Sequence, residues 1–495
     1  MSVKSKHPET QGLHAGWRSD PTTGSVAVPI YQTTSYQFES SEHASDLFAL
    51  RQLGNIYTRL GNPTTDVLEQ RVAALEGGVA ALAVASGQTA TAYAVQNLAI
   101  VGDNIVASTD LYGGSYNLFK NTFREAGIEV RFVDPSDPEN FRRATDERTR
   151  AYYAETLPNP KLSVLPIAEV AAIGREFGIP LIVDNTAAPL TARPFEHGAA
   201  VVVYSSTKYL GGHGTSIGGI IVDGGNFDWA AYPERQPLLN RPDPAYHGAV
   251  WVEAAKPLGP IAYILKARTT LLRTHGAALS PFNAFLTIQG LETLALRVDR
   301  HFENAEKVAA WLAKRPEIVS VNHPSLQTGA RKANADKYLT RGKGALLGFE
   351  LADGREAGAR FIDSLKLFYH AANIGDARSL AIHPATTTHS QLSPEEQLSA
   401  GVTPGYVRLA IGIEHIDDIL ADLDQRCRRR ANWPRRPSNR PSRRPLAGRR
   451  HLCGKVPPLR PICGQPAHLS GPKIAHLATD PTQSPDCVRN CAGDD

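Results

Sequence analysis

Two residues with complementary chemistry, Asp184 and Lys208, follow two consecutive apolar runs of the chain. Asp184 stands near the end of PLIVDN, and Lys208 comes just after VVVYSS, within VVVYSSTKYLGGHG. Ligands of open α/β sheets bind beyond the carboxyl ends of the strands, so both side chains are expected at that edge. A lysine there can form a Schiff base with an aldehyde cofactor, and an aspartate can keep a pyridine nitrogen protonated. The alternative is a surface lysine and an aspartate that caps a helix.

A phosphate group on such a cofactor would need its own donors, and two segments can supply them. Ser86, Gly87 and Gln88 lie between a predicted strand and a predicted helix. Backbone amides at a helix N-terminus bind phosphate well, and glycine permits a close approach. Ser205 and Thr207 add two hydroxyl groups, which point to the same side of an extended segment. These five residues are therefore predicted to bind the phosphate, although a strand, Ser-Gly and helix in succession also occur in proteins that bind none.

Apolar runs alternate with helix-length segments through this part of the chain, which is the pattern of a doubly wound α/β sheet. The runs are continuous rather than alternating in polarity, as expected of strands that are buried on both faces. They are ALAVAS (81–86), NIVAS (104–108), VRFV (130–133), AYYAE (151–155), PLIVDN (180–185), VVVYSS (201–206) and GGIIVD (218–223). Residues 89–100 and 166–178 are predicted crossover helices.

The segments on either side of the predicted sheet differ from it. The polar, turn-rich N-terminal arm shows little periodicity, and residues 226–260 are predicted to be an ordered loop rich in Pro and Tyr. A smaller C-terminal domain is predicted from the strands ALLGFEL and VRLAIGIE and from a final amphipathic helix. The residues that share the apolar face of this helix are Ile416, Ile419, Leu420 and Leu423.

The composition is ordinary for a globular protein, with 42% hydrophobic and 21% charged residues. No apolar run approaches the roughly 20 residues needed to span a bilayer, so a membrane is not an expected partner. The N-terminal sequence also lacks the apolar stretch of a secretory signal peptide. The cytoplasm is therefore the expected location.

The chain changes character near residue 426. Residues 427–495 contain 14 Lys and Arg but 4 Asp and Glu, whereas residues 1–426 contain 39 and 45. The part before residue 427 has no cysteine, so it cannot use thiol catalysis or a disulfide framework. All of the cysteines lie after that point: Cys427, Cys453, Cys463, Cys487 and Cys491.

Two functions of this tail compete with simple disorder. The stretch RRRANWPRRPSNRPSRRP could attract nucleic-acid phosphates, but Trp433 is its one aromatic residue, so a solvated, disordered tail is favoured. His451, His468 and the later cysteines lack the paired spacing of zinc ligands, so no metal is expected. We interpret the tail as an accretion, such as a frameshifted or read-through end.

Four separated motifs occur in order along the chain: NIYTRLGNPT (55–64), SGQTA (86–90), ETLPNP with IVDNT (155–160 and 182–186), and SSTKYLGGHG (205–214). Together they resemble the Cys/Met-metabolism family of pyridoxal-phosphate (PLP) enzymes, over about residues 8–425. The resemblance implies that PLP is the cofactor and that Lys208 carries it.

The resemblance also implies the fold: the PLP-dependent transferase fold of the aspartate-aminotransferase type, fold type I. A large domain with a mainly parallel, doubly wound sheet would then be joined to a smaller α+β domain. The expected divisions are an N-terminal arm that contacts a neighbouring subunit (1–60), the PLP-binding domain (61–262), the small domain (263–426) and the tail (427–495).

The family pattern implies roles for three aromatic and basic residues. Tyr57 and Arg59 would reach the phosphate of a neighbouring subunit's cofactor, and Tyr57 would also contact the substrate. A homodimer would then be the smallest active unit, and a homotetramer is the expected assembly. Tyr112 would stack on the pyridine ring and could move a proton, although a core aromatic residue is the alternative.

Four further residues have implied roles beside the ring and the substrate. Thr186 would contact the cofactor, and Asn159 would contact either the phenolic oxygen of the ring or the carboxylate of the substrate. Arg408 in GYVRLAIGIE would clamp that carboxylate with help from Ser379. A lone arginine on a strand is usually structural, so the role of Arg408 depends on the family pattern.

Within the family, the chain most resembles the O-acetylhomoserine sulfhydrylases. The similarity lies in HAGWRSDPTTGSVAVPIYQTTSYQF, LFALRQLGNIYTRLGNPT and PDPAYHG (242–248). It implies that sulfide replaces acetate at Cγ to give homocysteine, or that a small thiol gives methionine. The alternatives are a γ-lyase and a cystathionine synthase. Methionine γ-lyases usually carry Cys two residues after the stacking Tyr, where this chain has Gly114.

Overall fold

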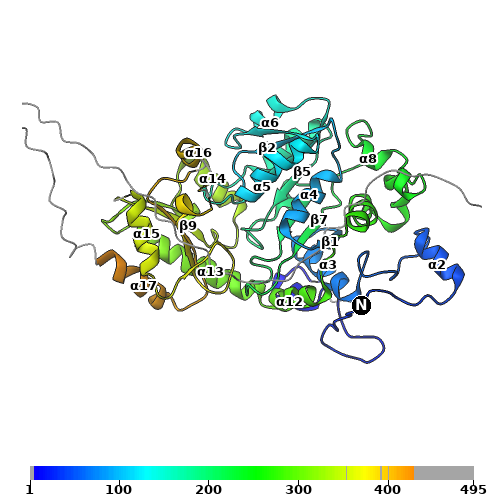
Figure 1. Cartoon of the computed structure of the whole chain (residues 1–495), viewed down its shortest axis with the longest axis horizontal. Coiled ribbons are helices and arrows are strands. Elements are labelled where there is room, and N and C mark those ends of the chain that lie inside the picture. The colour runs from blue at the N-terminus through cyan, green and yellow to red at the C-terminus, as the bar shows by residue number, and fades with distance from the viewer. Residues whose placement is uncertain (1–4, 353, 389, 391–392, 400, 429–495) are drawn as a thin grey trace, which may run out of the picture. The chain divides into compact units, whose positions relative to one another are not determined.

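The computed structural model describes residues 5–352, 354–388, 390, 393–399 and 401–428 (Figure 1). The nucleic-acid and zinc hypotheses for the tail, with Trp433, His451, His468 and Cys453 onward, concern residues outside these ranges. Within the described ranges, no helix is both long enough and apolar enough to cross a membrane.

A seven-stranded sheet, in the order β1-β7-β6-β5-β4-β2-β3, is built from the first half of the chain. Neighbouring strands are parallel, except that β7 is antiparallel to both β1 and β6. The strands are β1 (Ala80–Val84), β2 (Asn104–Ser108), β3 (Glu129–Val133), β4 (Thr149–Glu155), β5 (Leu181–Asp184), β6 (Val201–Ser205) and β7 (Gly219–Asp223). Each strand overlaps one of the predicted apolar runs, and the prediction of a mainly parallel sheet is confirmed.

Both faces of this sheet are buried, except at the edge strand β3, whose residues are exposed or half-buried, because successive residues of a strand point into different hydrophobic cores. In β4, Tyr152 and Ala154 pack in one core, while Ala151 and Tyr153 pack in the other. Helices line both cores, as a doubly wound arrangement requires. Those of the first core include α3 (Pro63–Glu76), α7 (Ile167–Glu176), α12 (Pro281–Glu292) and α13 (Leu294–Leu312), and those of the second include α4 (Gly87–Gln96), η1 (Leu118–Phe123), α10 (Ala262–Lys266) and η5 (Ala267–Leu272).

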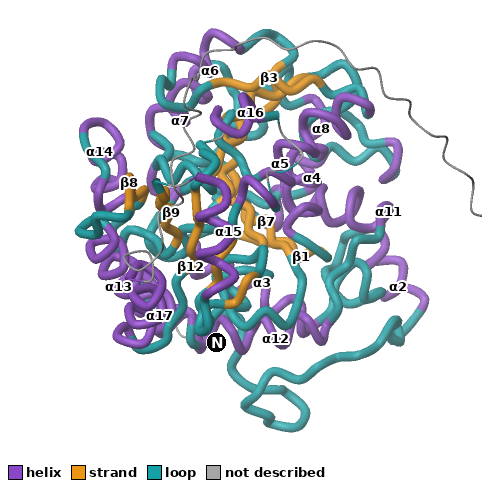
Figure 2. The backbone as a smooth tube through the Cα atoms, turned by 60° about the vertical axis from the view of Figure 1, so that its left-hand side comes forward, coloured by secondary structure: helices purple, strands orange, loops and turns teal. Residues whose placement is uncertain are grey.

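A second sheet, in the order β10-β11-β12-β9-β8, follows later in the chain (Figure 2). Its neighbours are antiparallel, apart from the parallel pair of β10 and β11. The strands are β8 (Ile318–Asn322), β9 (Leu346–Leu351), β10 (Tyr369–His370), β11 (Leu380–Ile382) and β12 (Tyr406–Ala410).

Helices α13 and α15 (Gly354–Ser364) contact this sheet, and α17 (Ile416–Arg428) contacts α13. In α17, Ile419 and Leu423 are fully buried, and Ile416 and Leu420 pack against the same core. The predicted apolar face of the last helix is therefore confirmed. The remaining α-helices of the described ranges, apart from those named below, are α5 (Gly113–Asn117), α6 (Glu139–Ala144), α11 (Arg273–His275), α14 (Gly329–Tyr338) and α16 (Pro394–Ser399).

The N-terminal arm contains two helices that its weak periodicity did not reveal. Helix α1 (Pro8–His14) packs on α3, α12 and α13, where the buried Gly12 allows close backbone contact with Leu291 of α12. Helix α2 (Ser41–Phe48) begins after Ser40, whose hydroxyl accepts a hydrogen bond from the amide of His43 at 3.0 Å. Helix α1 is stabilised by packing on distant residues and helix α2 by its N-terminal cap. Neither kind of interaction requires a long apolar pattern in the sequence.

The segment predicted as a loop between residues 226 and 260 also contains short helices, α8 (Pro237–Asn240) and α9 (Trp251–Ala254). Trp251 is completely buried, and its indole N–H donates to Asp243 at 2.9 Å. Trp251, together with the buried Phe227, Trp229 and Leu239, therefore anchors the segment to the second core.

The packing of α1 on α12 predicts that Gly12→Ala destabilises the protein. A Cβ at residue 12 would lie 2.8 Å from the carbonyl oxygen of Leu291, so the two helices would have to separate. We expect the free energy of unfolding, measured in urea, to fall by about 1–3 kcal/mol. Gly113→Ala is the matched control, because an added Cβ there meets nothing within 4 Å. A gain in stability from Gly12→Ala, as glycine replacement usually gives in a helix, would contradict this packing.

Candidate active site

Lys208 lies in the turn that follows β6, half-buried and held by backbone contacts. Its amide donates to the carbonyl of Ser205 at 3.1 Å, and its carbonyl accepts from the amide of Gly212 at 2.8 Å. The buried guanidinium of Arg297 donates to the carbonyl of Tyr209 at 2.8 Å, which fixes the next peptide. The lysine is therefore presented on a rigid turn.

The electrostatic surroundings of Lys208 favour its neutral amine. Burial, and then the positive charge of Arg408, lower the pKa of Lys208 to about 8. Its Nζ donates to Oδ1 of Asn373 at 2.5 Å. A neutral amine is nucleophilic, so near neutral pH this lysine is better suited than an exposed one to attack an aldehyde.

Arg408 approaches Lys208 from β12 of the second sheet. It is 5% exposed, and one of its terminal nitrogens donates to the carbonyl of Asn373 at 2.9 Å. Its Nε is buried without a partner, so the guanidinium has a donor available for an anion. Burial lowers the pKa of Arg408 to about 10, which leaves it charged at neutral pH. These properties suit a clamp for a carboxylate.

Asn373 is a site residue that the sequence reasoning missed. Its side chain accepts from Lys208 and its carbonyl accepts from Arg408. Asn373 therefore links two basic residues that lie 165 and 35 positions away from it in the sequence. No motif marks it, because these contacts arise only when the two sheets come together.

Ser379, the residue predicted to help Arg408, has other partners. Its hydroxyl donates to Glu414 Oε2 at 2.8 Å and accepts from the amide of Gly412 at 2.9 Å, and its amide donates to Glu414 Oε1 at 2.6 Å. The side chain is fully buried. A contact between Ser379 and a substrate therefore stays a prediction, and the geometry instead brings Asn373 to Arg408.

Asp184 ends β5 and is joined to the segment before Lys208 by Thr186. The amide of Thr186 donates to Asp184 Oδ1 at 2.9 Å, and the Thr186 hydroxyl accepts from the amide of Ser205 at 2.8 Å. Burial raises the pKa of Asp184, while hydrogen bonds from Thr186 and Tyr153 oppose that shift. A cationic partner such as a protonated pyridine nitrogen would favour the ionised form.

Tyr112 is anchored through its main chain rather than its ring. Its amide donates to Oε1 of Glu155, at the end of β4, at 2.5 Å, and its side chain is 52% exposed. A Cβ at Gly114 would lie 2.5 Å from Tyr112 Cε1 and 3.2 Å from the Gln88 side chain, so the aromatic ring and Gln88 meet above Gly114. An exposed ring in this position can stack on a planar ligand.

The segment Ser86-Gly87 lies against the end of β6. A Cβ at Gly87 would be 2.5 Å from the Cβ of Ser205, so only glycine allows this approach. Ser86 caps α4, since its Oγ accepts from the amide of Thr89 at 3.1 Å. The first turn of α4 leaves the amides of Gly87 and Gln88 without intrahelical partners, as an anion site requires.

The hydroxyl of Thr207 bonds Gly218, accepting from its amide at 3.1 Å. Asn159 lies in the segment after β4, and its buried Oδ1 has no hydrogen-bond partner. The adjacent Pro160 carbonyl accepts from the hydroxyl of Tyr406, which lies two residues before Arg408 on β12. The unpartnered oxygen of Asn159 is therefore available to a ligand.

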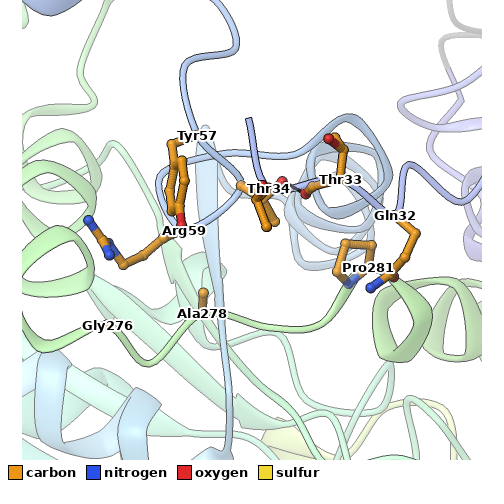
Figure 3. Close-up of a pocket in the computed structure, with 9 residues that line it drawn as sticks. Gln32, Thr33, Thr34, Tyr57, Arg59, Gly276, Ala278 and Pro281 are labelled. Carbon is orange, nitrogen blue, oxygen red and sulfur yellow. Dashed lines mark hydrogen bonds between the residues drawn. The ribbon is translucent and has the colours of Figure 1, made fainter. Parts of the chain in front are cut away.

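Tyr57 and Arg59 do not join this group within one chain. They line a separate, open cavity of about 370 Å³, together with residues such as Gln32, Thr33 and Pro281 (Figure 3). The Arg59 guanidinium lies 5.2 Å from the centre of the Tyr57 ring. Lys208 and Asp184 are not among the residues that line this cavity.

The residues that do come together fit PLP. They include an amine with a depressed pKa, a buried acid for the pyridine nitrogen, a glycine-lined helix N-terminus for the phosphate and a free amide oxygen at Asn159. Across the residues that the structure describes, no cluster of three or more His, Cys, Asp or Glu side chains could hold a metal ion. The donor set is thus that of an organic phosphate bound covalently through an amine.

Comparisons with known proteins agree with this donor set. The sequence model of the Cys/Met metabolism PLP-dependent enzymes matches residues 9–427. An O-acetyl-L-homoserine sulfhydrylase of Leptospira meyeri is 57% identical over 425 residues, which cover 84% of this chain and 96% of that protein. O-acetyl-L-homoserine sulfhydrylase 1 of Thermus thermophilus is 52% identical over 420 residues, with 84% and 99% covered.

A solved structure is also similar. It is that of a putative O-acetylhomoserine (thiol)-lyase of Campylobacter jejuni, which contains N'-pyridoxyl-lysine-5'-monophosphate. It aligns with a TM-score of 0.82 and 43% identity, covering 85% of this chain and all of that one.

The position of Lys208 predicts an amine that titrates close to pH 8. Competitive labelling of the full-length protein, after PLP has been removed, with an amine-selective reagent and mass spectrometry of the Lys208 peptide should give reactivity that rises with pH around a midpoint of about 8. Arg408→Met removes a positive charge and should move the midpoint upward. Arg378→Met, at a half-exposed arginine paired with Asp376, should leave it in place. An unchanged midpoint in Arg408→Met would show that Arg408 does not face the amine.

Proposed function

Because the chain belongs to the Cys/Met metabolism PLP-dependent enzymes, we propose that it replaces the acetate of O-acetyl-L-homoserine with sulfide. The products would be L-homocysteine and acetate, and a small thiol in place of sulfide would give methionine. The observation that carries the proposal is the identity of 57% and 52% to two O-acetyl-L-homoserine sulfhydrylases across nearly their whole lengths. The acetyl ester, rather than a succinyl ester, is proposed on the same basis.

In this proposal, Lys208 holds PLP and the strand ends orient it. Bound PLP withdraws electrons from the substrate, which acidifies the protons at Cα and Cβ. The carboxylate of Asp184 would bond the pyridine nitrogen, with Thr186 keeping that carboxylate in place.

The phosphate would be held by the α4 amides of Gly87 and Gln88 and by hydroxyls of Ser86, Ser205 and Thr207. Tyr112 would stack on the ring, and the side-chain N–H of Asn159 would donate to its phenolic oxygen.

The substrate-facing groups would orient the amino acid and move its protons. Arg408 would bind the α-carboxylate through the face that includes its unpartnered Nε, with the carboxamide of Asn373 beside it. Lys208, of which about half would be neutral near its lowered pKa of about 8, would take the proton from Cα and deliver it elsewhere on the substrate. Tyr112 is a second candidate for moving a proton. A protein nucleophile is not needed, which suits a chain without cysteine before residue 427.

We propose a homodimer as the smallest active unit and a homotetramer as the full assembly. The separation of Tyr57 and Arg59 from Lys208 supports this, because a second subunit could bring the arm cavity to the PLP phosphate. Exposed apolar side chains supply surface for such contacts, among them Val26, Ile217, Phe282 and Leu296, which are 81%, 61%, 52% and 70% exposed. The division into arm, large domain and small domain at residues 60 and 262, and a cytoplasmic location, belong to the same proposal.

A lyase of the same family is the competing function, and Gly114 argues against a methionine γ-lyase. The cysteine that those enzymes usually carry here would place its Cβ 2.5 Å from the Tyr112 ring. Tyr112 would then have to move from its present position. The arrangement around Gly114 therefore supports the transferase.

The proposal predicts which products form. The purified protein with PLP should show a visible Schiff-base absorbance band, and O-acetylhomoserine with sulfide should give homocysteine and acetate in equal amounts. Lys208→Ala should abolish the band and lower turnover by about a thousandfold or more, since it removes both the covalent anchor and the base. O-succinylhomoserine should be the poorer substrate when the two esters compete.

Two results would contradict parts of this proposal. If 2-oxobutyrate and ammonia were the main products, the enzyme would be a lyase. The absence of any visible band after PLP is supplied would contradict the assignment of Lys208.

The tail offers a separate prediction. The family match ends at residue 427, and the two curated relatives align over 96% and 99% of their lengths with 84% of this chain. Deleting residues 431–495 should therefore preserve the visible PLP band and the rate of homocysteine formation within about twofold, since these residues lie outside the region that the family model matches. Loss of either property would show that the tail is needed. Salt-sensitive nucleic-acid binding by the intact chain alone would favour a binding function for the tail.

A further inference from the structure

Glu155 and Asp184 end adjacent parallel strands, β4 and β5, and pair with each other in register. Directly paired residues point to the same face of a sheet, and neighbouring strands are about 4.8 Å apart. Glu155 is 8% exposed, and Asp184 is partly buried. The two carboxyl groups therefore lie close together, in a poorly solvated position at the ends of the strands.

The groups around this pair do not neutralise two negative charges. Among the described residues, neither Glu155 nor Asp184 has an ion-pair partner, and the nearby Lys161 is used by Asp110 at 2.5 Å. Tyr153, on the same face as Glu155, donates toward Asp184 and also bonds Thr91 at 3.1 Å. When two carboxyl groups lie close together without a cation, ionising both of them carries a large electrostatic free-energy cost. One of them should therefore keep its proton.

The hydrogen bonds indicate which of the two keeps it. Asp184 receives the amide of Thr186 and a bond from Tyr153, and both favour a carboxylate. Glu155 receives a bond from the amide of Tyr112, which lowers its pKa but does not outweigh its burial and the neighbouring carboxylates of Asp184 and Asp110. Burial and the charge of Asp184 raise the pKa of Glu155 well above its usual range.

We propose that Glu155 is a positioning residue that stays protonated beside an ionised Asp184 and fixes Tyr112 through its main-chain amide. The pair then carries one negative charge, which matches the single positive charge of a protonated pyridine nitrogen. This inference rests on the proposed function, because it assigns that nitrogen to Asp184. It adds a group that keeps the stacking tyrosine in position without competing for the cofactor's charge.

The first test measures whether Glu155 is neutral in the folded protein, and it does not depend on catalysis. Glu155→Gln preserves the carbonyl acceptor and cannot ionise. In the full-length chain, with PLP bound and again after its removal, the urea midpoints of wild type and Glu155→Gln are compared from pH 5 to pH 8. A glutamate with a raised folded pKa loses stability as pH rises above its usual 4.5, because only the unfolded chain ionises. The Glu155→Gln midpoint should therefore rise relative to wild type with pH. A constant difference would overturn the proposal.

The second test measures what Glu155 does for the cofactor. Glu155→Ala leaves the Tyr112 amide without its acceptor and should weaken PLP binding about tenfold, whereas Glu155→Gln should rescue the affinity to within about twofold of wild type. Asp223→Asn is the matched control. It replaces another buried carboxyl of the same sheet, with its pKa raised to about 7, that lies outside the site and should leave PLP binding unchanged.

The outcomes separate this inference from the proposed function. If wild type forms the visible band and homocysteine but Glu155→Gln loses PLP as Glu155→Ala does, the neutral-acid role is wrong and the function stands. If wild type forms no homocysteine, the proposed function fails, while the pH dependence of the urea midpoints still decides the protonation of Glu155.

Discussion

The removal of ionisable groups from water at the carboxyl edge of the seven-stranded sheet is the constraint on which the site depends. Strands β4, β5 and β6 end side by side, at Glu155, Asp184 and the turn that carries Lys208. Burial lowers the pKa of the amine and raises those of the two acids, so all three groups shift toward their neutral forms. A cofactor with its own phosphate and pyridine charges would reverse this balance for Asp184 and leave the amine ready for covalent bonding. The same desolvation thus makes Lys208 a better nucleophile and means that Asp184 ionises readily only beside a cation.

The second sheet completes what the first leaves open. Arg408 on β12 and Asn373, in the segment before β11, reach Lys208 and add a cation and a carboxamide to the strand ends. The charge of Arg408 contributes to the low pKa of Lys208, so the carboxylate binding proposed for Arg408 would be coupled to the protonation of the amine. A substrate carboxylate that neutralised Arg408 would raise the basicity of Lys208 when a proton must be taken from Cα. The second sheet therefore both encloses the site and helps to set the basicity of Lys208.

The site also requires two segments of the chain to pack very closely, and glycine makes this possible at residues 87 and 114. Gly87 lets the start of α4 touch the end of β6, which brings helix amides next to Ser205. Gly114 leaves room for the Tyr112 ring, whose amide is held by Glu155. Tyr57 and Arg59, by contrast, lie with the N-terminal arm at a separate cavity, so one chain alone presents an incomplete set of the expected phosphate ligands.

Short-range patterns in the chain were sufficient to predict the seven strands, the order of chemistry-bearing residues at their ends and the family, because strand periodicity and local motifs are properties of short segments. The edge strand β3 is less buried than its apolar run predicted, since its residues are exposed or half-buried. The sequence also marked Asp184, Lys208 and the Ser86-Gly87 turn. Folding brings Asn373 into contact with Lys208 and Ser379 into contact with Glu414, and it pairs Glu155 with Asp184 and bonds it to Tyr112. These contacts join residues tens to more than a hundred positions apart, and their energies come from burial and from neighbouring charges. Neither quantity exists until the sheets have formed and packed, so no local pattern in the chain could have revealed them.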